Sequence, residues 1–229
     1  MSKTVEPDSG SALEELTQDA SSRKRFLSMV GGAGAAGALA MFVAACGDDD
    51  DDSDSASTSE TKEKKSGSAG QDLEIVNYAL TLEYLEAAFY ADVIKSGVVT
   101  DKKIAELATS IGENEQEHVD ALRATAKKLG KPAAKPKTDF QSVIDGGPMM
   151  ILETAATVEN LGAAAYLGQA GRIQSKEILA AALSIHTIEG RHAAALNTLV
   201  DKSIVPDGAF AKPASMEEVL PQIKPFLVS

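Results

Sequence analysis

Apolar positions recur every three or four residues along four stretches of the chain, which is the spacing of one face of an α-helix. In the first stretch, Val76, Leu80 and Ile94 belong to such a stripe. The pattern predicts helices over about Leu73–Lys95, Asp101–Leu129, Pro148–Ala170 and Ser175–Leu199. Alanine is abundant and strand-length runs of β-branched residues are scarce, so we expect an all-α domain.

Each apolar stripe is interrupted near its middle by side chains that can bind a metal ion. The first and third helices carry one glutamate each, and the second and fourth carry a Glu-x-x-His pair. The segments LEYLEAAFY and VENLGAAAY align without a gap, as do EQEHVDAL and EGRHAAAL, so the chain reads as a duplicated helical hairpin. The candidate metal ligands are Glu83, Glu115, His118, Glu159, Glu189 and His192.

The lengths of the connections predict how the four helices are joined. The turns around Gly97–Thr100 and Gly171–Gln174 are short, so each flanking pair should form an antiparallel hairpin. The segment Gly130–Gly147 is long enough to return along the whole bundle. We therefore predict a four-helix bundle with one long crossover. After it, Pro206–Ser229 should pack against the bundle without a catalytic role and contain a short helix at Met216–Ile223.

The six candidate ligands suit a pair of metal ions. Residues three apart on a helix lie on nearly the same side, so the Glu and His of each pair can reach one ion. Four carboxylates balance two divalent cations, and this oxygen-rich set favours iron or manganese over a structural zinc site. The alternative is a set of buried polar residues without metal, in which each carboxylate would cost about several kcal/mol in desolvation and the four would repel one another. Tandem Glu-x-x-His pairs with two single glutamates are the ligand arrangement of ferritin-like di-iron bundles.

Other polar residues near the stripes are weaker candidates. Tyr90 and Tyr166 follow Glu83 and Glu159 by seven residues, where each phenol can either donate to a ligand carboxylate across the bundle or simply fill the core. His186 lies one turn before Glu189 but has no histidine counterpart in the first repeat, so we expect it at the surface or beside the ligands. Two further groups are discounted: Glu86, whose counterpart is Gly162, and the off-stripe acids Glu113, Glu117 and Asp120, which should be solvated.

The N-terminal 70 residues have the features of an export signal and a tether. Arg23-Lys24-Arg25 precedes a mildly apolar stretch of about 20 residues and resembles a twin-arginine signal with lysine in the second arginine position, so twin-arginine and general secretory export both stay open. The sequence Val43-Ala44-Ala45-Cys46 resembles a lipobox. We therefore expect residues 1–45 to be a signal peptide, Cys46 to be lipidated, residues 46–70 to be a disordered acidic linker, and residues 71–229 to form the bundle.

Composition excludes several classes of function. The formal charge is −12 and no basic stripe is present, which argues against nucleic-acid binding. Cys46 is the only cysteine, so the chain has no intramolecular disulfide, no Cys-x-x-Cys redox centre and no thiolate cluster. The expected location is the outer face of the cytoplasmic membrane or the cell envelope, with the lipid on Cys46 as the membrane contact. The oligomeric state stays open, a dimer included.

The motifs ALTLEYLEAAFY, ENEQEHVDAL, VENLGAAAYLGQA and VPDGAFAKPASMEEVL resemble the exported ferritin-like domain family, which is related to desiccation-related proteins. The resemblance covers about residues 71–225. It implies a di-iron or iron–manganese centre that reacts with dioxygen or peroxide as an oxidase or ferroxidase, with Glu115 and Glu189 bridging, Glu83 and Glu159 terminal, and one histidine per metal. The alternative is a non-catalytic envelope or desiccation-stress protein whose metal is structural or vestigial.

Overall fold

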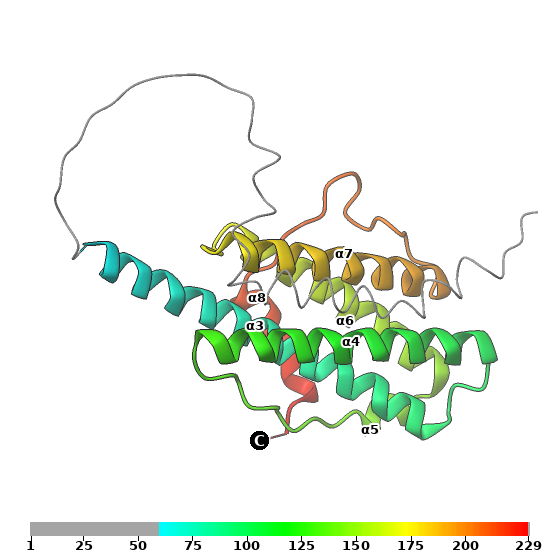
Figure 1. Ribbon diagram of the computed structural model, residues 1–229. Coiled ribbons are helices and arrows are strands. Elements are labelled where there is room, and N and C mark those ends of the chain that lie inside the picture. Colours follow the sequence, from blue (N-terminus) through cyan, green and yellow to red (C-terminus); the bar gives the residue numbers. More distant parts are fainter. Residues whose placement is uncertain (1–59, 229) are drawn as a thin grey trace, which may run out of the picture.

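The computed structural model describes residues 60–228 of the chain. Four long helices form the bundle: α3 (Glu60–Ser96), α4 (Lys102–Leu129), α6 (Gly147–Ala170) and α7 (Lys176–Leu199). α3 packs along α4 and α6 along α7, while α3 and α7 run in one direction and α4 and α6 in the other (Figure 1). The predicted all-α bundle with short, long and short connections is therefore confirmed.

Helix-capping side chains explain why two of the predicted starts are accurate. The Asp101 carboxylate accepts a hydrogen bond from the backbone N–H of Ile104 (3.0 Å) at the start of α4. The Ser175 hydroxyl accepts one from Ile178 N–H (3.3 Å) at the start of α7. Each cap satisfies one of the N–H groups that the first helical turn leaves unpaired. Gly97 makes the sharp turn before α4 with a φ of 65°, a conformation that glycine adopts without strain.

Two elements differ from the sequence prediction. α3 begins at Glu60 and not near Leu73, so its first turns occupy the end of the segment predicted to be a disordered linker. Glutamate, lysine and alanine in this stretch are strong helix formers, and they can extend a helix whose later turns are already held by packing. The long connection also contains a short helix, α5 (Gln141–Asp145), that was not predicted. Residues 1–59, with the expected signal peptide, Cys46 and most of the linker, lie outside the described residues.

Two apolar clusters lie on either side of the bundle's middle. One contains Tyr90, Ile111, Leu152 and Leu196, together with other buried residues. The other contains Leu80, Leu122, Tyr166 and Ile185, again with further residues. On each of the four helices, the candidate ligands fall between a residue of one cluster and a residue of the other. The polar centre is therefore enclosed by hydrophobic packing at both ends, which excludes water from it.

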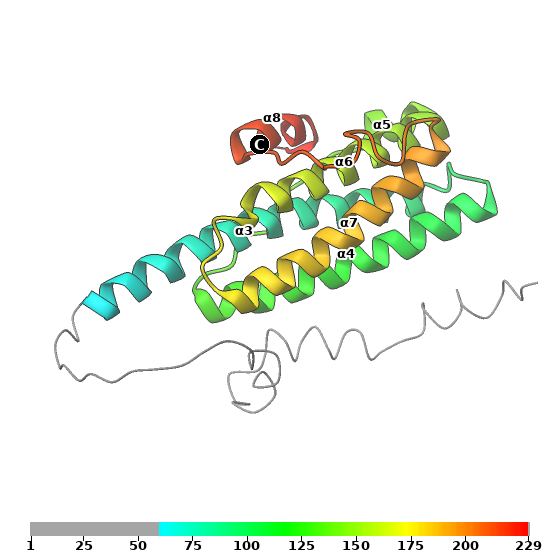
Figure 2. The ribbon, with the colours of Figure 1, turned by 90° about the horizontal axis from the view of Figure 1, so that it is seen from above.

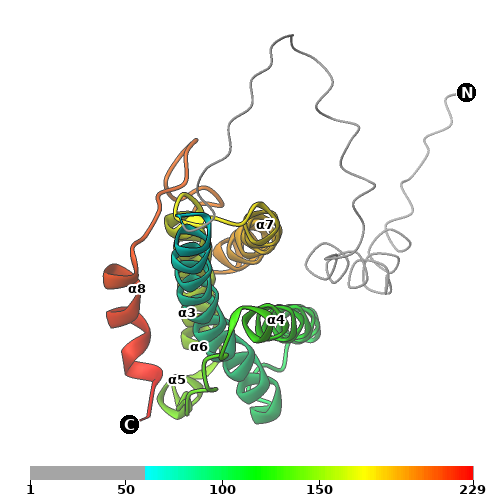
Figure 3. The same cartoon turned by 60° about the vertical axis from the view of Figure 1, so that its left-hand side comes forward.

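The C-terminal segment packs on the outside of the bundle. α8 (Met216–Ile223) has the predicted bounds, is followed by the 3₁₀ turn η1 (Lys224–Phe226), and contacts α6. It lies on the α3/α6 side of the bundle, away from α4 and α7 (Figures 2 and 3). Backbone hydrogen bonds hold the segment in place, among them Ala214 N–H to Ala164 O (2.9 Å) and Asp139 N–H to Phe226 O (3.0 Å). In the described part of the chain, no helix is long and apolar enough to span a membrane.

Candidate metal centre

All six sequence-predicted ligands meet in the middle of the bundle. α3 contributes Glu83, α4 contributes Glu115 and His118, α6 contributes Glu159, and α7 contributes Glu189 and His192. The four carboxylates are fully buried, His192 is 6% exposed, and His118 is partly buried. Four carboxylates in a closed apolar interior are a costly arrangement unless positive charge compensates them.

The six residues form two overlapping groups, each of which can hold one metal ion. Glu83, Glu115, His118 and Glu189 present ligand atoms that all lie within 4.8 Å of one another. Glu115, Glu159, Glu189 and His192 do the same. Glu115 and Glu189 belong to both groups, whereas each of the other four residues belongs to one. Each hairpin therefore contributes to both groups, and neither group is complete without the other hairpin.

The histidine nitrogens lie among several carboxylate oxygens at once. Nδ1 of His118 is 3.2 Å from Glu83 Oε2, 3.0 Å from Glu115 Oε2 and 3.3 Å from Glu189 Oε1. Nδ1 of His192 is 2.9 Å from Glu115 Oε1 and 3.1 Å from Glu159 Oε2. One ring N–H has a single proton to donate, so it cannot satisfy all of these oxygens. A divalent cation among the same atoms would bind the nitrogen and the oxygens together.

Several buried carboxylate oxygens have no hydrogen-bond donor among the described residues. Glu189 lacks a partner on both of its oxygens, and Glu115 lacks one on Oε1, whose close contact with His192 does not have hydrogen-bond geometry. Buried polar atoms in proteins are nearly always paired, so each orphaned oxygen needs an explanation. The unpaired atoms belong to the two residues shared by both groups. The carboxylate oxygens and imidazole nitrogens of these residues thus fit two cations as ligands.

The pKa values of the ligand side chains also indicate that the four buried carboxylates need compensating positive charge. Burial raises the pKa of Glu83 to about 7, although nearby His118 lowers it in part. Burial, with the charge of Glu115, raises the pKa of Glu189 well above its usual range. Burial would lower the pKa of His192, but the neighbouring carboxylates of Glu115 and Glu159 raise it to about 9. In the absence of metal, protons take the place of the missing positive charge.

The two tyrosines bind the single glutamates in a crossed pattern. Tyr90 on α3 donates a 2.6 Å hydrogen bond to Glu159 Oε1 on α6. Tyr166 on α6 donates a 2.5 Å hydrogen bond to Glu83 Oε1 on α3. Of the two roles that the sequence left open, the structure shows the donor role for both residues. Each hydrogen bond fixes one carboxylate so that its other oxygen faces the histidines.

Three other polar residues complete the surroundings of the centre. The amide nitrogen of Asn114 lies 3.1 Å from Nε2 of His192 and orients that ring, a role that nothing in the repeat pattern indicated because the aligned residue is Ile188. His186 belongs to neither ligand group, and its Nδ1 lies 3.0 Å from the carbonyl oxygen of Ala163. Glu86, which the sequence analysis discounted, is 3% exposed and lies beside the ligand carboxylates. The acids Glu113, Glu117 and Asp120 are exposed, as predicted.

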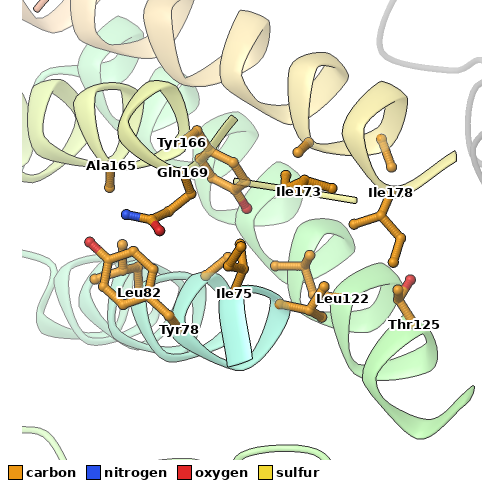
Figure 4. Close-up of a pocket in the computed structure, with 14 residues that line it drawn as sticks. Ile75, Tyr78, Leu82, Leu122, Thr125, Ala165, Tyr166, Gln169, Ile173 and Ile178 are labelled. Atoms are coloured by element: carbon orange, nitrogen blue, oxygen red, sulfur yellow. The ribbon is translucent and has the colours of Figure 1, made fainter. Parts of the chain in front are cut away.

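A small apolar cavity is lined in part by Tyr166, the residue that donates a hydrogen bond to Glu83. Its volume is about 30 Å³, and Figure 4 shows Tyr166 in its wall together with Ile75, Leu122 and Ile178. The hydroxyl of Tyr78, also in the wall, is buried and has no hydrogen-bond partner among the described residues. A cavity of this size has room for about one or two water-sized molecules. The Tyr166 phenol, which donates to Glu83, thus joins the cavity to the centre.

Comparison with known proteins agrees with the fold. No curated protein matches the chain. A model of the ferritin-like domain matches residues 71–202, which include α4, α6 and α7, most of α3, and all six candidate ligands. Since the match covers more than half of the sequence and the helices have the expected order, the protein belongs to the ferritin-like domain family.

Proposed function

We propose that the protein binds two metal ions, both iron or one iron and one manganese, and uses them to reduce dioxygen or peroxide as an oxidase or ferroxidase. The observation that carries this proposal is the sharing of Glu115 and Glu189 between two four-residue groups. Glu115 and Glu189 would each hold both ions, Glu83 with His118 would complete the ligands of one ion, and Glu159 with His192 those of the other. Four carboxylate charges then offset two divalent cations.

The ligand types favour iron or manganese. Each group offers three carboxylates and one imidazole, an oxygen-rich set typical of iron and manganese sites, and contains no thiolate. When bound, two ferrous ions supply two electrons, which with two protons convert dioxygen to hydrogen peroxide or hydrogen peroxide to two water molecules. The surrounding residues keep bulk water out, and Tyr90 and Tyr166 hold the terminal carboxylates in position.

The reaction can be tested on anaerobic protein loaded with ferrous iron. We expect two ions per chain, and mixing with dioxygen or peroxide should consume the oxidant and raise the near-ultraviolet absorption of ferric iron. Glu189→Gln, which removes one shared carboxylate charge, should abolish both effects, whereas Glu153→Gln at an exposed position of α6 should leave them unchanged. A protein that binds two ions but reacts with neither oxidant would have a structural metal site, and the envelope or desiccation-stress role would replace this proposal.

We propose further that the domain is exported and held at the membrane by a lipid on Cys46. The support is the sequence Val43-Ala44-Ala45-Cys46 after a mildly apolar stretch. Mass spectrometry of the membrane fraction should find a diacylglycerol-modified N-terminus at Cys46, and Cys46→Ser should release or mislocalise the protein. Recovery of the unmodified chain with Met1 in place would contradict this proposal.

A further inference from the structure

Glu86 lies one turn after Glu83 on α3 and points into the same buried region. Its side chain is 3% exposed. Oε1 of Glu86 lies 2.9 Å from the position that a Cβ atom would occupy at Gly162 on α6. The absence of a side chain at residue 162 therefore leaves the space that the Glu86 carboxyl group occupies.

The internal duplication explains why a glycine faces this glutamate. Aligning LEYLEAAFY with VENLGAAAY pairs Glu83 with Glu159, Tyr90 with Tyr166, and Glu86 with Gly162. Glu86 and Gly162 are thus equivalent positions of the two hairpins, and they approach each other across the α3–α6 interface. Only one of two facing equivalent positions can carry a long side chain. The duplicated arrangement is therefore asymmetric here, with one carboxyl group where perfect symmetry would require two or none.

Glu86 shares this space with an unpaired oxygen of a ligand. Oε2 of Glu189 lies 2.8 Å from the same Cβ position at Gly162, and it has no hydrogen-bond donor among the described residues. Two carboxyl groups from different helices thus converge on one point at the edge of the centre. Between two carboxylates, a cation is the partner that satisfies both.

We propose that Glu86 is a seventh ligand residue of the metal centre, its fifth carboxylate, and supplies an oxygen, on the Gly162 side, to one of the two ions. This inference rests on the proposed function, since it requires that the centre binds metal. Metal binding by Glu86 would make the two metal positions unequal, because the equivalent position of the second hairpin is Gly162, which has no side chain. The ion that Glu86 contacts should bind more tightly and have a higher coordination number than its neighbour.

The charges around Glu86 agree with this role. Burial raises the pKa of Glu86 well above its usual range, and the charges of Glu189 and Glu83 raise it further. A divalent ion at the shared carboxylates reverses the local charge and favours the ionised, metal-binding form.

The test uses Co²⁺ as the probe, because its visible absorption reports coordination number. Wild-type protein should bind two Co²⁺ ions. In Glu86→Gln, which keeps the size of the side chain, one binding step should weaken by about tenfold or more and the absorption of one of the two ions should change. Glu153 on α6 is exposed, so Glu153→Gln serves as the charge-matched control, with no change expected.

If Glu86→Gln titrates and absorbs like wild type, Glu86 is not a ligand and the inference fails while the proposed function stands. If wild type itself binds no Co²⁺, both fail.

A second pair of variants tests the space at Gly162. The new methyl group in Gly162→Ala would lie 2.8 Å from Glu189 Oε2 and 2.9 Å from Glu86 Oε1, so both carboxyl groups must move. We expect the same weakened Co²⁺ step with unchanged helical circular dichroism. Gly190→Ala on α7 is the matched control, because a Cβ there meets no atom within 4 Å. A Gly162→Ala protein with wild-type Co²⁺ affinities and spectrum would overturn the inference.

Discussion

Tyr166 donates its phenolic hydrogen bond to Glu83, a residue of the opposite hairpin, over a distance of 2.5 Å. Tyr90 makes the equivalent bond to Glu159, so each tyrosine binds the terminal glutamate of the other half. These bonds are buried, and they connect α3 to α6 directly beside the candidate ligands. The tyrosines therefore link the association of the two hairpins to the position of the ligand carboxylates.

Removing one of these phenols should loosen the metal site without unfolding the bundle. Tyr166→Phe keeps the ring in the core but leaves Oε1 of Glu83 without its donor, so we expect about tenfold weaker metal binding. A Co²⁺ competition titration measures the change. Tyr84→Phe is the matched control, since Tyr84 is a buried tyrosine on the same helix as Glu83 and belongs to an apolar cluster. Equal losses in both variants would mean that the hydrogen bond to Glu83 has no specific role.

Shared and unshared ligands should differ in how many ions they control. Glu115→Gln or Glu189→Gln alters both ligand groups and should remove both iron ions. Glu83→Gln or Glu159→Gln alters one group and should leave about one ion per chain bound. Iron analysis after anaerobic loading and desalting gives the stoichiometry. Retention of two ions in either shared-ligand variant would refute the bridging assignment.

The stability of the metal-free protein should fall as pH rises. The pKa of Glu83 is raised to about 7 and that of His192 to about 9, so the folded state keeps protons that the unfolded state releases at about pH 4.5 and 6.5. Protonation of His192 stabilises the fold fully below pH 6.5, and this stabilisation is lost as pH approaches 9. The contribution of Glu83 is lost between pH 4.5 and 7.

Thermal unfolding in the presence of a chelator, from pH 5 to 9.5, measures this effect as a falling melting temperature. Metal ions replace the protons, so protein loaded with Co²⁺ should show the opposite trend over the same range. A melting temperature of the metal-free protein that stays level or rises with pH would show that the imidazoles are neutral in the folded state.

The docking of the C-terminal segment should depend on a single glycine of α6. A Cβ atom at Gly168 would lie 1.9 Å from the backbone oxygen of Ala214, and a backbone atom cannot move aside as a flexible side chain can. Gly168→Ala should therefore destabilise the protein by about 1–3 kcal/mol, because α8 and the residues before it must shift. Urea unfolding measures the loss. Gly171→Ala, whose Cβ would meet no atom within 4 Å, should lack this penalty.

Local signals explain which parts of the fold were predictable from the sequence. The starts of α4 and α7 depend on Asp101 and Ser175, which cap the helices through bonds within a few residues. The start of α8 follows from the Ser215–Glu218 capping box, also a local feature. The position of α5 and the early start of α3 are not marked in this way. α5 carries Val143 into the core, so packing against the rest of the bundle contributes to its position.

The candidate site was predictable where the two repeats agree and was missed where they differ. The six ligands and both tyrosines occur at aligned positions, so duplication amplified their signal. Glu86 aligns with Gly162 and Asn114 with Ile188, and comparison of the repeats therefore discounts both polar residues. Their importance depends on contacts across the bundle, between Glu86 and the space at Gly162 and between Asn114 and His192. A pattern read along one chain does not contain such cross-helix distances.

The division of both ligand groups between the hairpins has a consequence for how such a centre can arise. A chain with only one hairpin could complete either group only by pairing with a second copy, and its metal affinity would then vary with protein concentration. The crossover between α4 and α6 joins the two halves covalently and removes that dependence. Once joined, the halves can diverge, and the glycine at residue 162 opposite Glu86 is a difference that two identical subunits cannot have.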